Sequence, residues 1–405
     1  MCGVGRAAAS CLQRHGVNEN TQSSTPLPPI EYVPDGATAR RALGSAGVDG
    51  YQALLLVSFG GPERAEDVKP FLRRVTAGRD VPESRLDKVA EHYYAAGGVS
   101  PLPAQCRSLL EALRTELAGT SLEIYWGNRN WHPLLEDTLA QMRDDGVERA
   151  LAFVTSAYGG YSSCRQYLDD IVAAQAKVGP RAPRVEKLRL YYNHPGWVEP
   201  WASNLARGLE ACNPVTAGIP GAGDETTGTV EARPAGAGAV EVLFSAHSIP
   251  VAMARNSPYV GHVTEAARLA AEGARVKSWQ LVWQSRSGSP SSPWLGPDVS
   301  DAIRSSSAGT FVVVPIGFAC DNMEVVYDLD IEAAAAAREK GAHFVRAATV
   351  SSSPAFVRMV RELVQERVAP FGPRRSEGTF GPWPDNCPEG HCPASAPMAS
   401  RIAIG

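Results

Sequence analysis

The chain has 405 residues, and its hydrophobic fraction of 44% and charged fraction of 20% are those of a soluble globular protein long enough for two domains. Its formal net charge of −4 excludes nucleic acid as the main partner, because binding phosphates requires a concentrated basic surface. No apolar run reaches the roughly 18 residues that cross a membrane, so we predict no transmembrane segment and a cytoplasmic location.

Residues 1–47 mix Gly, Ala, Ser, Pro and Asn without sustained periodicity, and they lack the apolar core of a secretory signal. We predict that this segment is a disordered extension, or that translation starts further along the chain. Without a secretory signal, the eight cysteines are not expected to form a disulfide framework.

Residues 50–185 are predicted to form a first α/β domain, because short apolar runs alternate with longer helical patterns, as in parallel βαβ units. The predicted strands are 53–59, 122–126 and 150–155. The predicted helices are 65–75, 103–117, 133–145 and 166–177.

Residues 186–370 repeat this alternation and are predicted to form a second α/β domain, interrupted by a flexible Gly- and Pro-rich insertion at 213–239. The predicted strands are 186–191, 240–245, 279–283, 310–315 and 344–347. The predicted helices are 195–212, 260–275, 298–305, 323–340 and 354–367, and a tail follows at 371–405. The pattern therefore predicts two doubly wound, Rossmann-like domains with parallel sheets, which bind ligands at the carboxyl ends of their strands.

His247 stands in Ser245-Ala-His-Ser-Ile-Pro250, where the strand at 240–245 ends, so we predict it at the ligand-binding edge of the second sheet. A histidine there can accept a proton near neutral pH or bind a metal through its neutral ring. The alternative is a histidine that only hydrogen-bonds to its own loop.

Glu324, Asp328 and Glu332 recur every four residues and are predicted to share one face of the helix at 323–340. Like charges at this spacing repel one another, but a row of carboxylates suits a path for a hydrated dication or for protons. The alternative is an acidic helix face that is simply solvated.

Three arginines are predicted on loops of the same crevice, at Arg129, Arg165 and Arg286. Turn geometry explains the glycines around them but not the guanidinium groups, which suit the recognition of carboxylates.

Five motifs in order make the chain resemble the ferrochelatases over residues 50 to 370. They are Leu54-Leu-Leu-Val-Ser-Phe-Gly-Gly-Pro-Glu63, Gly97-Gly-Val-Ser-Pro101, Ser245-Ala-His-Ser-Ile-Pro250, Gln284-Ser-Arg286 with Trp294-Leu-Gly-Pro297, and Gly317-Phe followed by Asp321, Glu324 and Tyr327-Asp-Leu-Asp330. The resemblance implies the class II chelatase fold, with a porphyrin bound between two domains and Fe²⁺ as the second substrate.

The resemblance also assigns roles to residues. His247 matches the cleft histidine that takes pyrrole protons or delivers metal, and Glu324 matches the acidic residue facing it, so both are the predicted catalytic and Fe²⁺-binding pair. Asp328 and Glu332 match an acidic row that conducts metal or protons. The residues predicted to bind the porphyrin are Phe59, Arg129, Tyr158, Ser285 and Arg286.

Two positions depart from the family pattern. Asn322 stands where many relatives have His, and Asn130 stands where some have a second His. Because neither amide ligates iron well or relays a proton, an outer metal site is not expected here, and the chemistry is assigned to His247 and Glu324.

The tail motif Pro384-Asp-Asn-Cys-Pro-Glu-Gly-His-Cys-Pro393 resembles the segment with which some ferrochelatases hold a [2Fe–2S] cluster. Its Cys387 and Cys392, with Cys164 of the first domain, supply three of the four ligands that a cluster takes. The fourth is predicted to be His391 or Cys320. The alternative is a frayed tail with two idle thiols.

The opening motif and the tail are those of actinobacterial relatives, which favours coproporphyrin III over protoporphyrin IX as the substrate. An inactive porphyrin- or haem-binding chaperone and a cobalt or nickel chelatase are the other functions compatible with the motifs. As partners, the resemblance implies the porphyrin, iron and transient contacts with other haem-pathway enzymes.

Overall fold

The computed structural model describes residues 50–212, 238–287, 292–369, 371–388 and 390–393. The predictions for residues 1–47, for almost all of the insertion at 213–239 and for the end of the tail lie outside these described residues. Among the described residues, no helix combines the length and apolar character needed to cross a bilayer.

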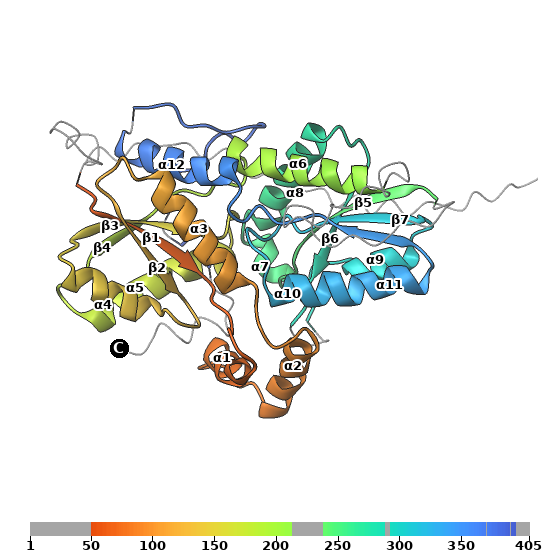
Figure 1. Cartoon of the computed structure of the whole chain (residues 1–405), viewed down its shortest axis with the longest axis horizontal. Coiled ribbons are helices and arrows are strands. Elements are labelled where there is room, and N and C mark those ends of the chain that lie inside the picture. The colour runs from red at the N-terminus through yellow and green to blue at the C-terminus, as the bar shows by residue number, and fades with distance from the viewer. Residues whose placement is uncertain (1–49, 213–237, 288–291, 370, 389, 394–405) are drawn as a thin grey trace, which may run out of the picture. The chain divides into compact units, whose positions relative to one another are not determined.

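The first sheet contains four parallel strands in the order β2-β1-β3-β4 (Figure 1). These strands are β1 Ala53–Ser58, β2 Glu123–Asn128, β3 Arg149–Val154 and β4 Arg184–Lys187. All six residues of β1 are buried, because alternate side chains contact helices on opposite faces of the sheet. This explains why β1 is a continuous apolar run in the sequence.

The helices of this half cover both faces of the sheet. Figure 1 shows α4 and α5 on one face and α3 and α12 on the other. The helices are α1 Val68–Val75, α2 Glu83–Ala95, α3 Leu102–Glu116, α4 Leu135–Asp144 and α5 Gln166–Val178, with a short π-helix, η3 Tyr161–Arg165, before α5.

The second sheet repeats the arrangement with the order β6-β5-β7-β8, again all parallel. Its strands are β5 Val240–His247, β6 Gln280–Gln284, β7 Thr310–Val314 and β8 His343–Arg346. Its helices are α6 Pro195–Ala211, α7 Val251–Arg255, α8 Tyr259–Gly273, α9 Val299–Ser305, α10 Met323–Val325, α11 Ala334–Glu339 and α12 Pro354–Val368. The predicted fold class, two Rossmann-like α/β domains, is confirmed.

The predicted and the observed elements differ in several places. The strand predicted at 186–191 is β4, which begins earlier, pairs with β3 and therefore belongs to the first sheet, not to the second half. The helix α2 was not predicted. The helix predicted at 323–340 is interrupted by a π-helix, η4 Val326–Ala333, between α10 and α11.

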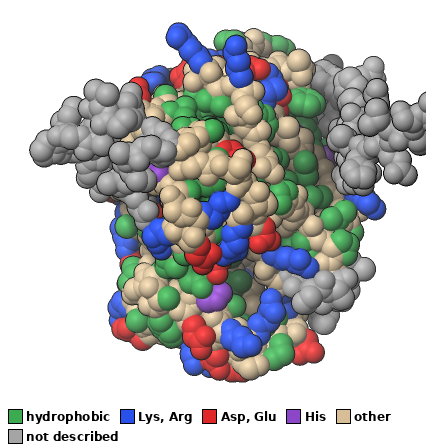
Figure 2. Space-filling model, turned by 90° about the vertical axis from the view of Figure 1, so that its right-hand side faces the viewer, with side chains coloured by type: hydrophobic (Ala, Val, Ile, Leu, Met, Phe, Trp, Pro, Cys, Tyr) green, Lys and Arg blue, Asp and Glu red, His purple; other side chains and the backbone are tan. Residues whose placement is uncertain are grey.

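A buried ion pair joins the end of the first sheet to the last helix. Arg189, just beyond β4, donates to Glu366 of α12 at 2.6 Å and 2.9 Å, and both side chains are almost fully buried. The same guanidinium donates at 2.8 Å to the carbonyl of Arg375 in the tail. On the face shown in Figure 2, by contrast, acidic and basic side chains are interspersed at the surface.

We predict that Arg189→Met lowers the free energy of unfolding by about 3–5 kcal/mol, because it leaves the Glu366 carboxylate buried without its partner. Urea denaturation measures this loss. The matched control is Arg184→Met, since Arg184 pairs with Glu186 but is 74% exposed, and exposed pairs contribute less than about 1 kcal/mol. Equal losses for the two variants would contradict the prediction.

Candidate active site

His247 is the last residue of β5, at the carboxyl end of the second sheet. Its Nδ1 lies 2.5 Å from the Ser248 carbonyl oxygen, and since a carbonyl can only accept, Nδ1 carries a hydrogen. The Tyr259 hydroxyl at the start of α8 donates to the His247 carbonyl at 3.0 Å. The ring is thus held on one side, and Nε2 is left to face the opposite wall of the site.

Glu324 faces His247 across this space. Its Oε1 lies 3.6 Å from His247 Nε2, and the two side chains are 44% and 33% exposed. Glu324 belongs to α10, and Asn322 caps the N-terminus of this helix. The Asn322 side chain accepts a hydrogen bond from the Val325 amide at 2.9 Å. The two residues predicted as a pair are therefore brought together, although 77 positions of sequence separate them.

The pKa of His247 reflects this arrangement. Burial of the ring disfavours its charged form, but the Glu324 carboxylate, by charge and by hydrogen bonding, outweighs that effect. With smaller contributions from the Ser248 carbonyl and Asp328, the pKa rises from 6.5 to about 9. The substrate-free site therefore holds an imidazolium beside a carboxylate at neutral pH.

Asp328 lies on η4, one turn beyond Glu324. It accepts a hydrogen bond from the Ser285 hydroxyl and a longer one, of 3.3 Å, from Gln284 Nε2. Gln284 Nε2 also donates to the Glu324 carbonyl at 3.2 Å, while Ser245 on β5 donates to Gln284 Oε1 at 2.9 Å. The end of β6 therefore fixes the acidic segment against β5.

Burial raises the pKa of Asp328, the Ser285 hydroxyl lowers it, and the charges of Glu324 and Glu332 raise it again. The result is a pKa of about 7. Asp328 is thus the carboxyl group of the row that changes its protonation state near neutral pH. Glu332, the last member, is exposed.

The unpredicted helix α2 contributes aromatic residues to this site. Burial, followed by the charges of Glu324 and Asp328, raises the pKa of Tyr93, which places its neutral phenol near both carboxylates. The neighbouring ring of His92 stacks on Tyr327 of η4, with centroids 4.1 Å apart. The sequence signal that could have pointed to Tyr93 is its position, four residues before the Gly97-Gly-Val-Ser-Pro motif.

The residues predicted to bind porphyrin are spread over different environments. Phe59 is partly buried under the guanidinium of Arg129, 5.6 Å from its ring. Arg129 itself is 5% exposed and bonds to Asp170 at 2.5 Å. It is therefore already paired with a carboxylate of the protein, which does not agree with its predicted role in binding a substrate carboxylate.

Tyr158 and Arg286 lie in opposite environments. Tyr158 is 1% exposed and donates to the Ile316 carbonyl at 2.6 Å, which ties the end of the first sheet to the second. Its side chain has no surface for a substrate, contrary to the prediction. Arg286 is exposed and donates to the Ser292 carbonyl at 3.3 Å.

The tail cysteines lie within electrostatic range of Cys164. Burial, and then the charges of Cys164 and Cys387, raise the pKa of Cys392 to about 12, so the three thiols are close enough for their charges to interact. His391 Nδ1 lies 2.9 Å from Cys392 Sγ, and Trp383 donates to Cys387 Sγ at 3.4 Å. Within the described ranges, no group of three or more His, Cys, Asp or Glu side chains is arranged to hold a metal ion.

Cys320 is not part of this group. Its thiol is buried and hydrogen-bonds to that of Cys106 on α3, which in turn contacts the Ser58 hydroxyl at 3.3 Å. The Cys320 thiol therefore interacts with Cys106 of α3, and its role as the alternative fourth cluster ligand stays a prediction.

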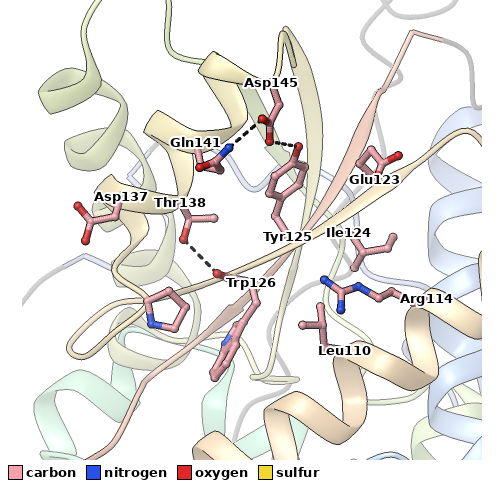
Figure 3. Close-up of a pocket in the computed structure, with 11 residues that line it drawn as sticks. Leu110, Arg114, Glu123, Ile124, Tyr125, Trp126, Asp137, Thr138, Gln141 and Asp145 are labelled. Carbon is pink, nitrogen blue, oxygen red and sulfur yellow. Dashed lines mark hydrogen bonds between the residues drawn. The ribbon is translucent and has the colours of Figure 1, made fainter.

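A separate hollow of about 530 Å³ lies along β2, between α3 and α4 (Figure 3). Several of its polar groups are bonded to one another: Asp145 accepts from Tyr125 at 2.8 Å and from Gln141 at 2.8 Å, and Thr138 donates to the Trp126 carbonyl at 3.0 Å. It contains none of the predicted site residues, and the satisfied groups offer no reactive side chain.

A sequence model described as Ferrochelatase matches residues 51–368, which include both sheets and the His247–Glu324 pair. The chain belongs to the ferrochelatase family. Ferrochelatases insert iron into a porphyrin, so the protein is an enzyme of porphyrin metallation, as predicted.

Curated ferrochelatases match most of the chain. "Ferrochelatase" of Rhodopirellula baltica is 45% identical, over 86% of this chain and 96% of the relative. "Coproporphyrin III ferrochelatase" of Frankia alni is 47% identical, over 87% and 89%, and that of Streptomyces coelicolor is 44% identical, over 86% and 94%. Among solved structures, SirB of Bacillus subtilis with Fe³⁺ aligns with a TM-score of 0.45 and 14% identity, over 79% of this chain and 96% of SirB.

Proposed function

We propose that this ferrochelatase inserts Fe²⁺ at the His247–Glu324 pair, with Glu324 binding the incoming iron and His247 accepting a pyrrole proton. The observation that supports this assignment is the 3.6 Å approach of His247 Nε2 to Glu324 Oε1 at the carboxyl end of the second sheet. Paired groups at that edge of a doubly wound fold are positioned to contact a ligand.

The raised pKa of His247 sets the order of events. With a pKa of about 9, the ring is protonated at neutral pH and cannot yet accept a proton. A dication bound to Glu324 cancels the negative charge that stabilises the imidazolium, so the ring loses its proton and becomes a base. Iron arrival thereby prepares the acceptor.

Two protons must leave the porphyrin for each Fe²⁺ that enters, so the site needs an exit for them. Asp328, with a pKa of about 7, can take up and release a proton at neutral pH. Exposed Glu332 lies beyond it along the same segment. We infer that protons leave from His247 to Asp328 and then to Glu332, and pass through Glu324 only after Fe²⁺ has moved from that carboxylate to the porphyrin.

For the substrate, we propose coproporphyrin III. Relatives of that name are 44–47% identical to this chain over most of its length. The arginines support this choice less than expected, because Arg129 is buried and Arg165 is bonded to Asp169 at 2.8 Å. Turnover of coproporphyrin III and protoporphyrin IX side by side decides between the two, and faster turnover of protoporphyrin IX would overturn the proposal.

His247→Ala and Glu324→Gln are each expected to lower kcat for iron insertion by about 100-fold or more, since each removes a group that acts on the reacting atoms. The metalloporphyrin absorbance band measures turnover. Glu339→Gln, at the exposed end of α11, is the matched control and keeps full activity. Wild-type turnover by His247→Ala would remove the assignment. An inactive wild-type protein that binds porphyrin would instead indicate the chaperone function.

Ser285→Ala is expected to shift the acidic limb of the kcat profile to higher pH. The Ser285 hydroxyl lowers the pKa of Asp328, so its removal raises that pKa above about 7. Asp328 accepts a proton only when ionised, hence activity falls as pH drops through its pKa, and in the variant this fall begins at a higher pH. Ser287→Ala is the control, and an unchanged limb in Ser285→Ala would exclude Asp328 from the proton path.

We propose, further, that Cys164, Cys387, Cys392 and His391 hold a [2Fe–2S] cluster. The proximity of the three thiols and the contact of His391 with Cys392 support this ligand set. The burial of Cys164 and Cys392 gives a cluster a partly enclosed environment. When bound, such a cluster supplies one-electron redox chemistry and cross-links the tail to η3.

Anaerobically purified protein is therefore expected to show visible absorption from the cluster, which Cys164→Ser and Cys392→Ser abolish. The thermal midpoint of unfolding should fall in the same variants, because the tail loses its attachment. Cys212→Ser, which changes a buried thiol at the C-terminal end of α6, is the control that keeps the colour. A colourless preparation of the wild-type protein, from cells grown with sufficient iron, would refute the proposal.

A further inference from the structure

Arg346, the last residue of β8, is a buried arginine that holds two carboxylates. Its side chain is 6% exposed. Its Nη1 and Nη2 donate to the two oxygens of Asp321 at 3.1 Å and 3.3 Å, and its Nε donates to Asp330 Oδ1 at 2.6 Å. Both aspartates are themselves only 16% exposed, so these ion pairs are poorly screened by solvent.

The two aspartates lie on either side of the proposed catalytic carboxylates. Asp321 precedes Asn322, which caps α10, and Asp330 lies within η4. Glu324 and Asp328 are on the segment between them. One guanidinium on β8 therefore binds the acidic segment at both ends, through Asp321 and Asp330 and not through Glu324 or Asp328.

The first sheet reaches the same point through α3. Gln105 Oε1 accepts from the Asp321 amide at 2.8 Å, and Gln105 Nε2 lies 3.4 Å from Asp321 Oδ2. The Asp321 end of the segment is thus fixed from both halves of the protein. Arg346 bonds to Asp321 and to Asp330 with the same guanidinium, so it links the two ends of the segment directly.

The acidic segment needs external restraint. A π-helix such as η4 is less favourable than a continuous α-helix and persists where surrounding contacts determine it. Repulsion along Glu324, Asp328 and Glu332 also favours spreading of the segment. Only a planar guanidinium, with donors in a fixed fork, can bind Asp321 through two nitrogens and Asp330 through a third, whereas a lysine ammonium is a point charge.

We propose that Arg346 is a positioning residue for iron insertion, which clamps Asp321 and Asp330 so that Glu324 stays opposite His247. This inference rests on the proposed function, because it acts through Glu324. It predicts that loss of the clamp changes the chemistry at Glu324 and not merely the stability of the protein.

The test is Arg346→Lys, which keeps the buried charge but cannot span both aspartates. We expect kcat to fall about 10-fold to 100-fold, the size of effect that follows a displacement of about 1 Å at a reacting group. The KM for iron should rise, while the KM for porphyrin should stay within about twofold of the wild type, since the segment positions the metal-binding carboxylate. Arg189→Lys is the matched control, because Arg189 is equally buried and also binds a carboxylate through two nitrogens.

A double-mutant cycle with Glu324→Gln separates positioning from a structural role. If Arg346 acts through Glu324, Arg346→Lys lowers the residual kcat of Glu324→Gln by less than about twofold. Two results would overturn the positioning role of Arg346 but leave the proposed function standing. One is a 10-fold to 100-fold fall in kcat when Arg346→Lys is added to Glu324→Gln. The other is an equal fall in kcat in Arg189→Lys and Arg346→Lys when both variants change the thermal midpoint equally. Wild-type activity of Glu324→Gln would overturn the proposed function itself, and with it the clamp's route to the chemistry.

Discussion

The arrangement of the site depends on one close backbone contact, between Gly317 and β5. Gly317 follows β7, and a Cβ atom at this position would lie 2.7 Å from the Ala246 Cα, closer than any side chain can approach. Its amide donates to the Ser245 carbonyl at 3.1 Å. The chain leaving β7 therefore crosses directly over the end of β5, next to His247. Any larger residue at Gly317 would push away the segment that carries Glu324.

From this contact the electrostatics of the site follow. The crossing brings a row of carboxylates to a histidine that is already oriented by the Ser248 carbonyl, and the resulting ion pair raises the pKa of His247. The same crowding raises the pKa of Asp328. The raised pKa of His247 reflects a favourable ion pair, whereas the raised pKa of Asp328 reflects a carboxylate that is costly to ionise; on the proposed mechanism, a bound dication lowers both pKa values. The site is thus arranged around a positive charge that arrives with the substrate.

The fold and the proximity of His247 and Glu324 were predictable because they depend on local patterns. Alternating apolar runs and helices indicate parallel sheets, and residues at the ends of neighbouring parallel strands must meet at one edge, as His247 and Glu324 do. The pairing of Arg129 with Asp170, 41 positions away, depends on how α5 packs, which no local pattern records. Likewise, the apolar residues after β4 resemble a strand, although only Arg184–Lys187 pairs with β3.

Other misses have similar causes. The helix α2 buries only Leu86 and Ala90, so its apolar periodicity is weak, and its role comes from Tyr93 and His92 meeting η4. A π-helix adds residues per turn without changing which residue types are used, so a helical pattern cannot distinguish η4 from an α-helix. In η4 the wider turn nevertheless keeps the predicted acidic row intact.

In the proposed mechanism, the two asparagines at positions where relatives have histidine leave the acidic row as the path for iron. Asn322 Oδ1 is committed to the Val325 amide, and Asn130 Nδ2 donates to the Phe59 carbonyl at 3.2 Å. Each side-chain amide is hydrogen-bonded to the backbone, so neither is free to turn toward a metal. On the proposed mechanism, a hydrated dication approaching His247 then meets carboxylates alone, which are oxygen ligands that bind it weakly enough to pass it on. The imidazole of His247 is the first nitrogen ligand or base it reaches. Without the outer histidines, iron insertion depends more on the position of Glu324. Gly317 permits this position, and the contacts around Asp321 maintain it.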